Sequence, residues 1–390
     1  MTPGARIAAA IEVLDAVAEG QAAEQALTNW ARRSRFAGSK DRAAVRDHVF
    51  DVLRCRRSAA HLGAGTDGRA LMLGLLRQRG VDPATLFTGE GHAPAALADG
   101  EAHPPAPPTD RGTRWNLPDW LVGRFEASLG AGAEPVALAL QDRAPVTVRV
   151  NTARTSVPEA AARLLACGIE TAPNPRAATA LTLTQGARRL RQSAPYAEGL
   201  VDLQDAASQA VVADLPAAGR TLDYCAGGGG KALALATAPD RTVFAHDIAP
   251  GRMADLPARA ARAGARITQL ATEALPGAAP FDIVLCDAPC SGSGAWRRAP
   301  EGKWRLTPER LADLTVVQDG ILDAAAALVG PDGTLAYATC SVLAEENEAR
   351  IAAFLDRQDG WRQVEARRFP VDTHGDGFFV AHLTRGPAAA

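Results

Sequence analysis

The sequence predicts an α/β protein whose C-terminal half is a doubly wound parallel sheet, preceded by a small α+β unit and an all-helical N-terminal segment. Three observations support this prediction. Short apolar runs alternate with helical stretches from Leu200 onward, two strand-like runs precede them, and apolar residues recur at helical spacing before residue 80. The 390 residues suffice for two or three domains.

Residues 1–81 are expected to form a helical domain, because Ile7, Ile11 and Leu14 recur at helical spacing and later segments do the same. The segment 32–57 contains nine basic residues and only three acids. The basic residues are Arg32, Arg33, Arg35, Lys40, Arg42, Arg46, Arg54, Arg56 and Arg57. This run is consistent either with a solvated helix face or with a surface that contacts phosphate groups.

Residues 82–116 are predicted to be a linker, because they are rich in Pro, Gly, Ala and Asp and poor in large apolar residues. Residues 117–195 are predicted to form the small α+β unit. It contains an alternating strand at 146–150, a helix at 158–167 and a second strand at 180–184.

The doubly wound domain is expected to span residues 196–386. Its helices fit between most of the predicted strands, as in βαβ units. The strands are expected at 200–203, 220–224, 242–247, 267–270, 281–286 and 334–339, with a terminal strand at 377–383.

Composition limits the class of protein. A net charge of -2 excludes a strongly basic coat for nucleic acid but not a local basic face. Six cysteines in so long a chain are no disulfide framework, and Cys286 and Cys290 have no second pair to complete a zinc site, so no metal is expected. No secretory signal and no apolar run of about 18 residues are visible. We therefore expect a cytoplasmic protein, without membrane contact and monomeric.

A glycine loop follows the strand that ends near Tyr224, in the order Cys225, Ala226, Gly227, Gly228, Gly229, Gly230 and Lys231. Such a loop lets backbone N–H groups approach a ligand closely, and by itself it suits NAD, ATP or S-adenosylmethionine. It is not a P-loop, because the spacing of Lys231 differs. Asp247 ends the next strand, where an acid can accept hydrogen bonds from ribose hydroxyls.

Two cysteines, Cys290 and Cys340, each lie just past a predicted strand end amid small residues, and Asp287 precedes the first. Open α/β folds bind ligands at this edge of the sheet. Two thiols and an acid suit a reaction at carbon 5 of cytosine, which must first be activated by thiolate addition at carbon 6. We expect packing roles for Cys55, Cys167 and Cys286.

These motifs resemble the Sun-type family of RNA cytosine-5 methyltransferases, particularly its bacterial members that act on small-subunit rRNA. The shared segments include the glycine loop, Asp-Ala-Pro-Cys-Ser at 287–291, Ala-Thr-Cys-Ser at 338–341 and Asp-Gly-Phe-Phe at 376–379. Others are 202–209, the Arg-Arg-Ala-Pro and Lys-Trp of 297–304, and Glu-Glu-Asn-Glu at 345–348. The resemblance covers about residues 115–385.

The resemblance implies a Rossmann-type class I methyltransferase domain, an RNA-recognition-like unit before it, and a shortened NusB-like RNA-binding domain at the N-terminus. It also implies that Cys340 is the nucleophile, that Cys290 assists product release and that Asp287 contacts the base. Lys231 belongs to the same catalytic set. Residues 225–231, Asp247 and Asp287 are implied to bind S-adenosylmethionine, and 16S rRNA is the implied substrate.

The chain departs from the family pattern at two places. Gly227 and Gly228 replace an alanine and a proline, so the empty loop is expected to be more flexible. Ala271, Thr272 and Glu273 stand where the family often has an acid near adenine, which leaves the adenine contact open. Three alternatives also remain at this level: a tRNA substrate, a non-catalytic RNA-binding factor and a dinucleotide-dependent oxidoreductase.

Overall fold

The computed structural model describes residues 1–386 and divides into two compact units. The first unit comprises residues 1–143 together with 296–306, and the second comprises residues 144–295 and the chain from 307 onward. Within the described residues, every helix is too short or too polar to cross a membrane.

The first unit is all-helical, as the sequence predicts. Helices α4 and α5 pack so closely that a Cβ added at Gly74 would lie 1.8 Å from the Ala59 carbonyl oxygen. Trp30, Met72 and Phe87 are buried in its core. The helices are α1 (Pro3–Ala18), α2 (Ala23–Arg33), α3 (Ser39–Arg54), α4 (Arg56–Gly63), α5 (Gly68–Gln78), α6 (Arg111–Trp115), α7 (Asp119–Leu129), α8 (Ala133–Ala139) and α15 (Glu301–Arg305).

The expected linker, 82–116, is not a free spacer. It contains two short 3₁₀ helices and α6, and Phe87 is buried under the Arg69 guanidinium. Arg69 also forms an ion pair with Glu101 at 2.7 Å. A single buried aromatic side chain and one ion pair anchor a segment whose composition is otherwise that of a linker. Helices α7 and α8 also lie in this unit, although the α+β unit was expected to begin at residue 117.

The segment 296–306 is part of the helical unit although it lies among the predicted strands of the C-terminal half. Trp296 stacks on Phe125 with ring centroids 6.0 Å apart. Lys303 Nζ donates to the Arg54 carbonyl at 2.7 Å, and Trp304 Nε1 donates to the Leu53 carbonyl at 2.7 Å. The segment is therefore fixed by the C-terminal end of α3.

The nine basic residues of 32–57 do not share one environment. Arg54 is buried and donates to the Arg297 carbonyl at 2.7 Å. Arg33, Arg46 and Arg57 form ion pairs with Glu12, Glu24 and Asp119. Arg32, Arg35 and Lys40 are exposed and have no ion-pair partner within residues 1–386. Part of the run is thus structural, and only its first part remains available to a polyanion.

The second unit contains a small antiparallel sheet in the order β2-β3-β1-β4. Its strands are β1 (Thr147–Val150), β2 (Glu170–Pro173), β3 (Ala180–Gln185) and β4 (Val201–Leu203), with α9 (Val157–Ala166) and α10 (Ala194–Ala197). The strand expected at 200–203 was assigned to the parallel sheet. This assignment is wrong, because Val201 pairs with Val150 of β1 in the small sheet.

The larger sheet has the order β10-β11-β9-β8-β5-β6-β7, with parallel pairing from β9 to β7 and antiparallel pairing of β10 and β11. Strand β10 was not predicted, because most of its side chains are exposed at the sheet edge and show no apolar run. The strands are β5 (Gly219–Asp223), β6 (Arg241–Ala245), β7 (Ile267–Gln269), β8 (Phe281–Asp287), β9 (Val329–Thr339), β10 (Trp361–Phe369) and β11 (Phe378–Arg385).

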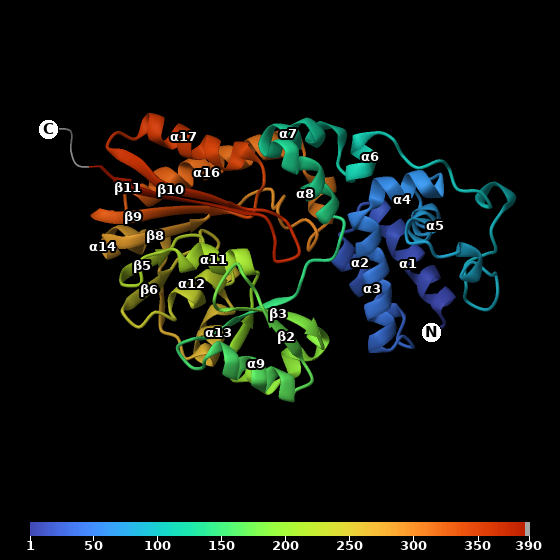
Figure 1. The fold of residues 1–390 in the computed structure, drawn as a ribbon, viewed down its shortest axis with the longest axis horizontal. Coiled ribbons are helices and arrows are strands. Elements are labelled where there is room, and N and C mark those ends of the chain that lie inside the picture. Colours follow the sequence, from blue (N-terminus) through green and yellow to red (C-terminus); the bar gives the residue numbers. More distant parts are fainter. Residues whose placement is uncertain (387–390) are drawn as a thin grey trace. The chain divides into compact units, whose positions relative to one another are not determined.

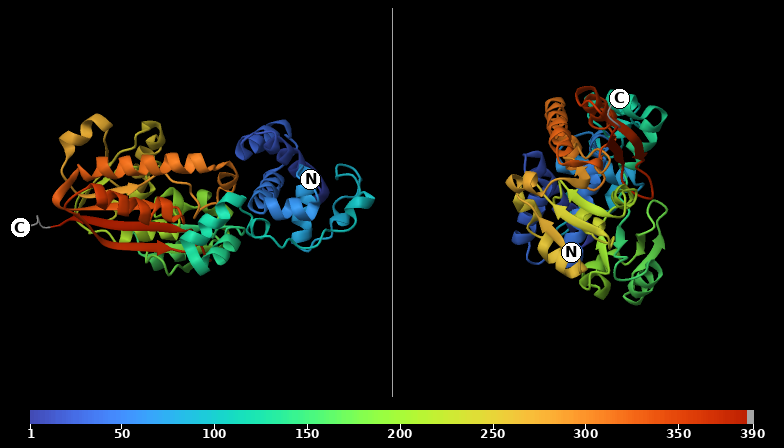
Figure 2. Two further views of the ribbon diagram at one scale, coloured as in Figure 1. Left: turned by 90° about the horizontal axis from the view of Figure 1, so that it is seen from above. Right: turned by 90° about the vertical axis from the view of Figure 1, so that its left-hand side faces the viewer.

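Helices cover both faces of this sheet, as a doubly wound fold requires. Figure 1 shows α16 and α17 on one face and α11 and α12 on the other, and Figure 2 shows the long α16 running along the sheet. Ile283 and Leu285 of β8 face one apolar core while Val284 and Cys286 face the other. The helices are α11 (Ala206–Ala213), α12 (Gly230–Leu235), α13 (Leu256–Ala263), α14 (Leu275–Ala278), α16 (Pro308–Ala326) and α17 (Glu348–Arg357).

Candidate active site

The two cysteines singled out in the sequence meet at the carboxyl ends of neighbouring parallel strands. Asp287, the last residue of β8, pairs with Ala338 of β9, two residues before Cys340. The loop after β8 returns toward β9, where Gly294 N donates to the Cys340 carbonyl at 2.9 Å. The Sγ atoms of Cys290 and Cys340 are 3.4 Å apart, and both thiols are free. Parallel pairing thus brings together side chains 50 positions apart in the chain.

The two thiols are electrostatically different. The hydrogen bond with Cys340 and burial raise the pKa of Cys290 well above the ordinary value of a thiol, and the negative charges of Cys340 and Glu346 add to this. Cys290 therefore keeps its proton at neutral pH and can donate it to the Cys340 sulfur. The raised pKa therefore assigns the role of proton donor to Cys290.

Lys231, the second residue of α12, forms an ion pair with Asp287 between Nζ and Oδ2 at 2.7 Å. Burial by itself lowers the pKa of Lys231, but Asp287, Asp223 and the Cys340 sulfur raise it overall, so the side chain stays charged. Its ammonium lies 5.1 Å from the Phe378 ring centre. Asp287 Oδ1 has no hydrogen-bond partner within residues 1–386, so it remains able to accept one.

Asp223 lies beside this ion pair at the end of β5 and is completely buried. Burial, and then the charge of Asp287, raise the pKa of Asp223 to about 7. The nearby backbone N–H of Ala232 lowers the pKa of Asp223 in part. Neither carboxylate oxygen of Asp223 has a hydrogen-bond partner within residues 1–386. Lys231 is thus the cation that limits repulsion between two carboxylates.

A buried carboxylate, Glu346, connects the two cysteine loops. Its Oε1 accepts from Ser291 N at 2.7 Å and from Gln318 Nε2 at 3.1 Å. Its Oε2 accepts from the hydroxyls of Ser291 and Ser341, each at 2.5 Å. Ser291 follows Cys290 and Ser341 follows Cys340, so one side chain fixes both backbones next to the sulfurs.

Two glycines permit a close backbone crossing beneath the cysteines. Gly377 N donates to the Gly294 carbonyl at 3.0 Å. A Cβ at Gly294 would lie 2.2 Å from the Gly377 carbonyl oxygen, which no side chain can tolerate without a backbone shift. The start of β11 therefore supports the loop that carries Cys290.

The glycine loop is held by Asp247 at the end of β6. Asp247 Oδ2 accepts from Gly227 N at 2.9 Å, and Oδ1 accepts from Ala249 N at 2.9 Å. Gly227 and Gly229 have φ values of +50° and +78°, the left-handed region that favours glycine. Asp247 therefore holds the loop in place although Gly227 and Gly228 replace the family's alanine and proline, and its predicted role toward ribose stays a prediction.

A cavity of about 230 Å³ lies beside this loop, lined by Tyr224, Cys225, His246, Asp247, Ile248, Arg252, Pro289, Val317, Gly320 and Ile321. Ile248 is 78 % exposed, and Val317 is 46 % exposed. These apolar side chains suit a flat aromatic ring, while Asp247 suits ribose hydroxyls. His246, which lines the cavity, hydrogen-bonds the Tyr224 carbonyl through Nδ1 and the Thr272 hydroxyl through Nε2. Thr272 belongs to the segment 271–273, for which the sequence left the adenine contact open.

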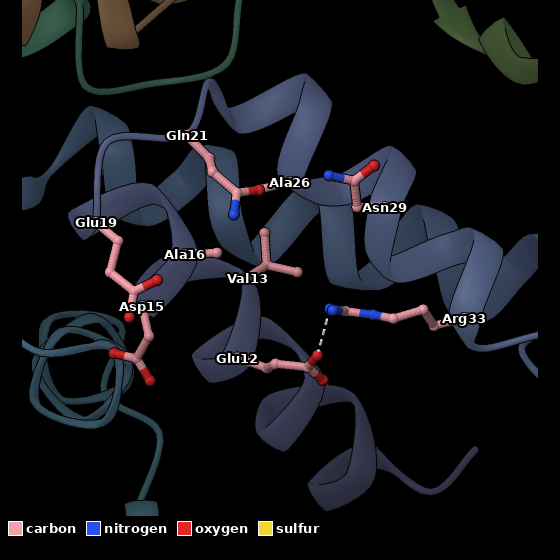
Figure 3. A pocket seen from close by; sticks show the side chains of 9 residues that line it. All are labelled: Glu12, Val13, Asp15, Ala16, Glu19, Gln21, Ala26, Asn29 and Arg33. Carbon is pink, nitrogen blue, oxygen red and sulfur yellow. Dashed lines mark hydrogen bonds and ion pairs between the residues drawn. The ribbon is translucent and has the colours of Figure 1, made fainter.

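A hollow in the first unit, between α1 and α2, has a different character. Glu12, Asp15 and Glu19 line it together with Arg33, which forms an ion pair with Glu12 at 2.7 Å (Figure 3). Three carboxylates against one guanidinium repel phosphate groups, so this hollow is no candidate for a nucleotide or RNA.

Comparison with known proteins places the chain in a family. Residues 211–384 match the model of the 16S rRNA methyltransferase RsmB/F family, and residues 117–188 match the RsmF/B-like ferredoxin-like domain. Ribosomal RNA small subunit methyltransferase B of Cronobacter sakazakii is 35% identical over 288 residues, which cover 70% of this chain and 67% of that protein. The chain belongs to the RsmB/F family. A relative with the same printed name from Vibrio cholerae is 33% identical over 292 residues, covering 70% of this chain and 66% of that protein.

Solved structures agree with the RsmB/F assignment at the level of the fold. The crystal structure of PH0851 covers 99% of each chain with a TM-score of 0.76 at 24% identity. A methyltransferase homologue from Pyrococcus horikoshii covers 71% of this chain and 97% of its own, with a TM-score of 0.62 at 25% identity. The predicted Rossmann-type methyltransferase fold, with a small α+β unit and a helical N-terminus, is confirmed, and the comparison describes the α+β unit as ferredoxin-like. The NusB-like assignment of the helices stays a prediction.

Sequence reasoning did not assign roles to several residues that the structure places in this RsmB/F site. Glu346 lies in a motif that carried the resemblance, but nothing in its local sequence shows that it is buried against Ser291. Phe378 also lies in a segment that carried the resemblance, and Asp223 stands two residues before the glycine loop. An acid at the end of the strand that precedes a glycine loop is a pattern that could have drawn attention to Asp223.

Proposed function

We propose that the chain transfers a methyl group from S-adenosylmethionine to carbon 5 of a cytosine in 16S rRNA, through a covalent bond between Cys340 and carbon 6. The observation that carries this proposal is the 3.4 Å separation of the Cys340 and Cys290 sulfurs at adjacent strand ends. Membership of a family of 16S rRNA methyltransferases supports the substrate class.

Carbon 5 of cytosine is a poor nucleophile in the intact ring. Addition of the Cys340 thiolate to carbon 6 makes carbon 5 enamine-like, so that it can attack an electrophilic methyl group. After transfer, the proton on carbon 5 must leave as the bond between sulfur and carbon 6 breaks. This sequence uses one nucleophilic sulfur and one separate group for the elimination.

Cys290 is suited to the elimination. It bears its proton at neutral pH because its pKa is raised, and its sulfur lies next to that of Cys340. It can give its proton to the departing Cys340 thiolate, and the Cys290 thiolate that this leaves can then take up the proton that carbon 5 loses, directly or through water. The site thus offers a protonated thiol directly beside the sulfur that is proposed as the nucleophile.

Asp287 and Lys231 would orient the base. Asp287 Oδ1 is available to accept a hydrogen bond from nitrogen 3 once that nitrogen is protonated as Cys340 adds to carbon 6, while Oδ2 is held by Lys231 Nζ at 2.7 Å. The Lys231 charge lies close enough to the Cys340 sulfur to interact with it, and it would attract the sulfur's electron density toward the site of addition. Both side chains therefore act on the addition step.

The cofactor fits beside this centre. Backbone groups of residues 225–230 and the Asp247 carboxylate would hold S-adenosylmethionine, with Ile248 and Val317 against its adenine. Burial raises the pKa of the Cys225 thiol, so Cys225 contributes to the wall as a neutral group. When bound, S-adenosylmethionine supplies an electrophilic methyl group.

The proposal is tested by incubating the protein with labelled S-adenosylmethionine and total RNA from a strain that lacks the gene. Label recovered in 16S rRNA as 5-methylcytosine supports the proposal. Label in tRNA retains the chemistry and changes the substrate. Binding of S-adenosylmethionine without any transfer to RNA or to ribosomal subunits would contradict an enzymatic role and favour a non-catalytic RNA-binding factor.

A further inference from the structure

A second cavity of the methyltransferase unit has a lining that suits an anion. It measures about 460 Å³ and lies between the small sheet and α13. Its charged lining residues are Arg191, Asp202, Asp255, Arg259 and Arg262. None of them belongs to the cysteine site or to the proposed cofactor cavity. Three guanidinium groups thus stand against two carboxylates.

A fourth arginine increases the positive charge next to this cavity. Arg149 of β1 is only 4 % exposed, and its Nε donates to Gln204 Oε1 at 2.8 Å. Its Nη1 has no hydrogen-bond partner within residues 1–386. Burial lowers the pKa of Arg149 to about 10, with opposing influences of Asp202 and Arg259, so it stays charged at neutral pH. A buried cation with an unpaired donor favours an anion nearby.

The arginines of the cavity are held in position. Asp202 binds Arg259 Nη2 at 2.7 Å and Arg262 Nη2 at 3.3 Å. The Arg262 guanidinium also stacks on Tyr196, 4.5 Å from the ring centre. Arg191 is exposed and has no ion-pair partner within residues 1–386. Asp202 is thus shared between two cations, which leaves an excess of positive charge.

The cavity is also connected to the glycine loop. Arg259 Nη1 donates to the Gly228 carbonyl, and Gln204 Nε2 donates to the Gly230 carbonyl at 3.3 Å. Lys231 follows directly. An anion bound by Arg259 would therefore act on the glycine loop, whose last residue, Lys231, forms the ion pair with Asp287.

We infer that this cavity binds a phosphodiester group of the substrate RNA, with Arg191, Arg259 and Arg262 as its contacts. Guanidinium groups match phosphate oxygens in pairs, and a stacked Arg–Tyr surface suits an unpaired base or ribose beside the phosphate. The inference rests on the proposed RNA substrate, and it adds a positioning site outside the reacting atoms.

The test compares Arg191→Ala and Arg262→Ala with the matched control Arg362→Ala, in the full-length protein. Arg362 is an exposed arginine on β10. Strand β10 forms one edge of the larger sheet, and β7, which directly follows α13 in the chain, forms the opposite edge. Affinity for a 16S rRNA fragment is measured at several salt concentrations, and affinity for S-adenosylmethionine is measured separately. Arg262→Lys is added, because it keeps the charge but loses the paired donors.

Both alanine variants are expected to bind RNA roughly tenfold more weakly. The slope of log affinity against log salt should fall by about 0.7 for each lost phosphate contact to single-stranded RNA. Affinity for S-adenosylmethionine should be unchanged, and Arg262→Lys should fall between the wild type and Arg262→Ala. The control should match the wild type in every measurement.

Three results would overturn the inference. RNA affinity and salt slope equal to wild type in both alanine variants would exclude the site, even when the wild type methylates RNA normally. Equal losses in Arg362→Ala would show a non-specific charge effect. Binding of inorganic phosphate that is lost in Arg191→Ala, without any change in RNA affinity, would assign the cavity to a free anion. Failure of methyl transfer by the wild type concerns the proposed function alone, because RNA binding is measured directly.

Discussion

Glu346 binds Ser291 twice, through Oε1 to the backbone N–H at 2.7 Å and through Oε2 to the hydroxyl at 2.5 Å. The same carboxylate accepts from the Ser341 hydroxyl. Because Ser291 and Ser341 directly follow the two cysteines, the separation of the sulfurs depends on a residue that touches neither of them. This relationship leads to the first prediction.

Glu346→Ala should reduce the rate of methyl transfer by more than tenfold while leaving affinity for S-adenosylmethionine nearly unchanged. The alanine removes the acceptor of the Ser291 N–H and one of the two acceptors of Gln318 Nε2, which keeps the Pro289 carbonyl. Each donor left unpaired inside the protein costs about 1–3 kcal/mol. Glu346→Gln should restore most of the rate. The glutamine oxygen can accept from the Ser291 N–H and from Gln318 Nε2, and the hydroxyls of Ser291 and Ser341 can rotate to accept from the glutamine NH₂ group. Equal rates in the alanine variant and the wild type would show that Glu346 does not position the cysteines.

Cys340→Ala should abolish methyl transfer and any covalent protein–RNA complex, since the sulfur that adds to carbon 6 is missing. Binding of S-adenosylmethionine should remain, which calorimetry can check. Retained turnover would remove Cys340 from the proposed role.

Cys290→Ala should permit addition but slow the elimination, so a covalent protein–RNA complex should accumulate. A denaturing gel of protein incubated with RNA and S-adenosylmethionine measures this directly. Cys286→Ala serves as a control, because Cys286 is fully buried in the sheet core, where its thiol faces α16 and α17 instead of Cys340. Normal turnover of Cys290→Ala without a complex would leave Cys290 with a structural role.

Gly294→Ala should destabilise the second unit by about 1–3 kcal/mol, because the added Cβ meets the Gly377 carbonyl oxygen and the backbones must separate. Activity should fall more steeply than stability, since the displaced loop carries Cys290. Gly277→Ala is the matched control, because no atom lies within 4 Å of its added Cβ. Thermal unfolding and methyl transfer are measured on both, and an undisturbed Gly294→Ala protein would contradict the close crossing.

The stability of the helical unit should rise between about pH 7 and pH 9. Burial lowers the pKa of Lys303 from 10.5 to about 7, so in this range the unfolded chain binds a proton that the folded chain does not. Stability therefore increases with pH, by at most about 1.4 kcal/mol per pH unit. The window ends near pH 9, because burial raises the pKa of Cys55 above 9.0, and above that pH the opposing slope of Cys55 offsets the slope of Lys303.

Lys303→Met should remove this pH dependence, and Lys40→Met, at an exposed position, should retain it. Denaturant unfolding followed by tryptophan fluorescence is the measurement, since all tryptophans except Trp361 lie in the helical unit. A flat profile in the wild type would show that Lys303 is charged or solvated in the folded protein.

Much of the site could be predicted because its residues follow strand ends. Cys290, Cys340 and Asp247 each follow a recognisable apolar run, and parallel pairing places such ends at one edge of a sheet. The glycine loop could be located for the same reason. The sequence could not show that Cys290 and Cys340 lie 3.4 Å apart, because this distance depends on the path of two loops.

The sequence by itself determined the alternation of strands and helices, the helical N-terminus and the placing of the cysteines, since these depend on local periodicity. Only the tertiary structure decided which strands pair. Val201 joins β1 because a period of two residues defines a face but not a partner. Long-range packing likewise assigned Trp296 and Lys303 to the helical unit and buried Glu346 beside Ser291, 55 positions away. A carboxylate that needs several donors finds them only where separate loops converge.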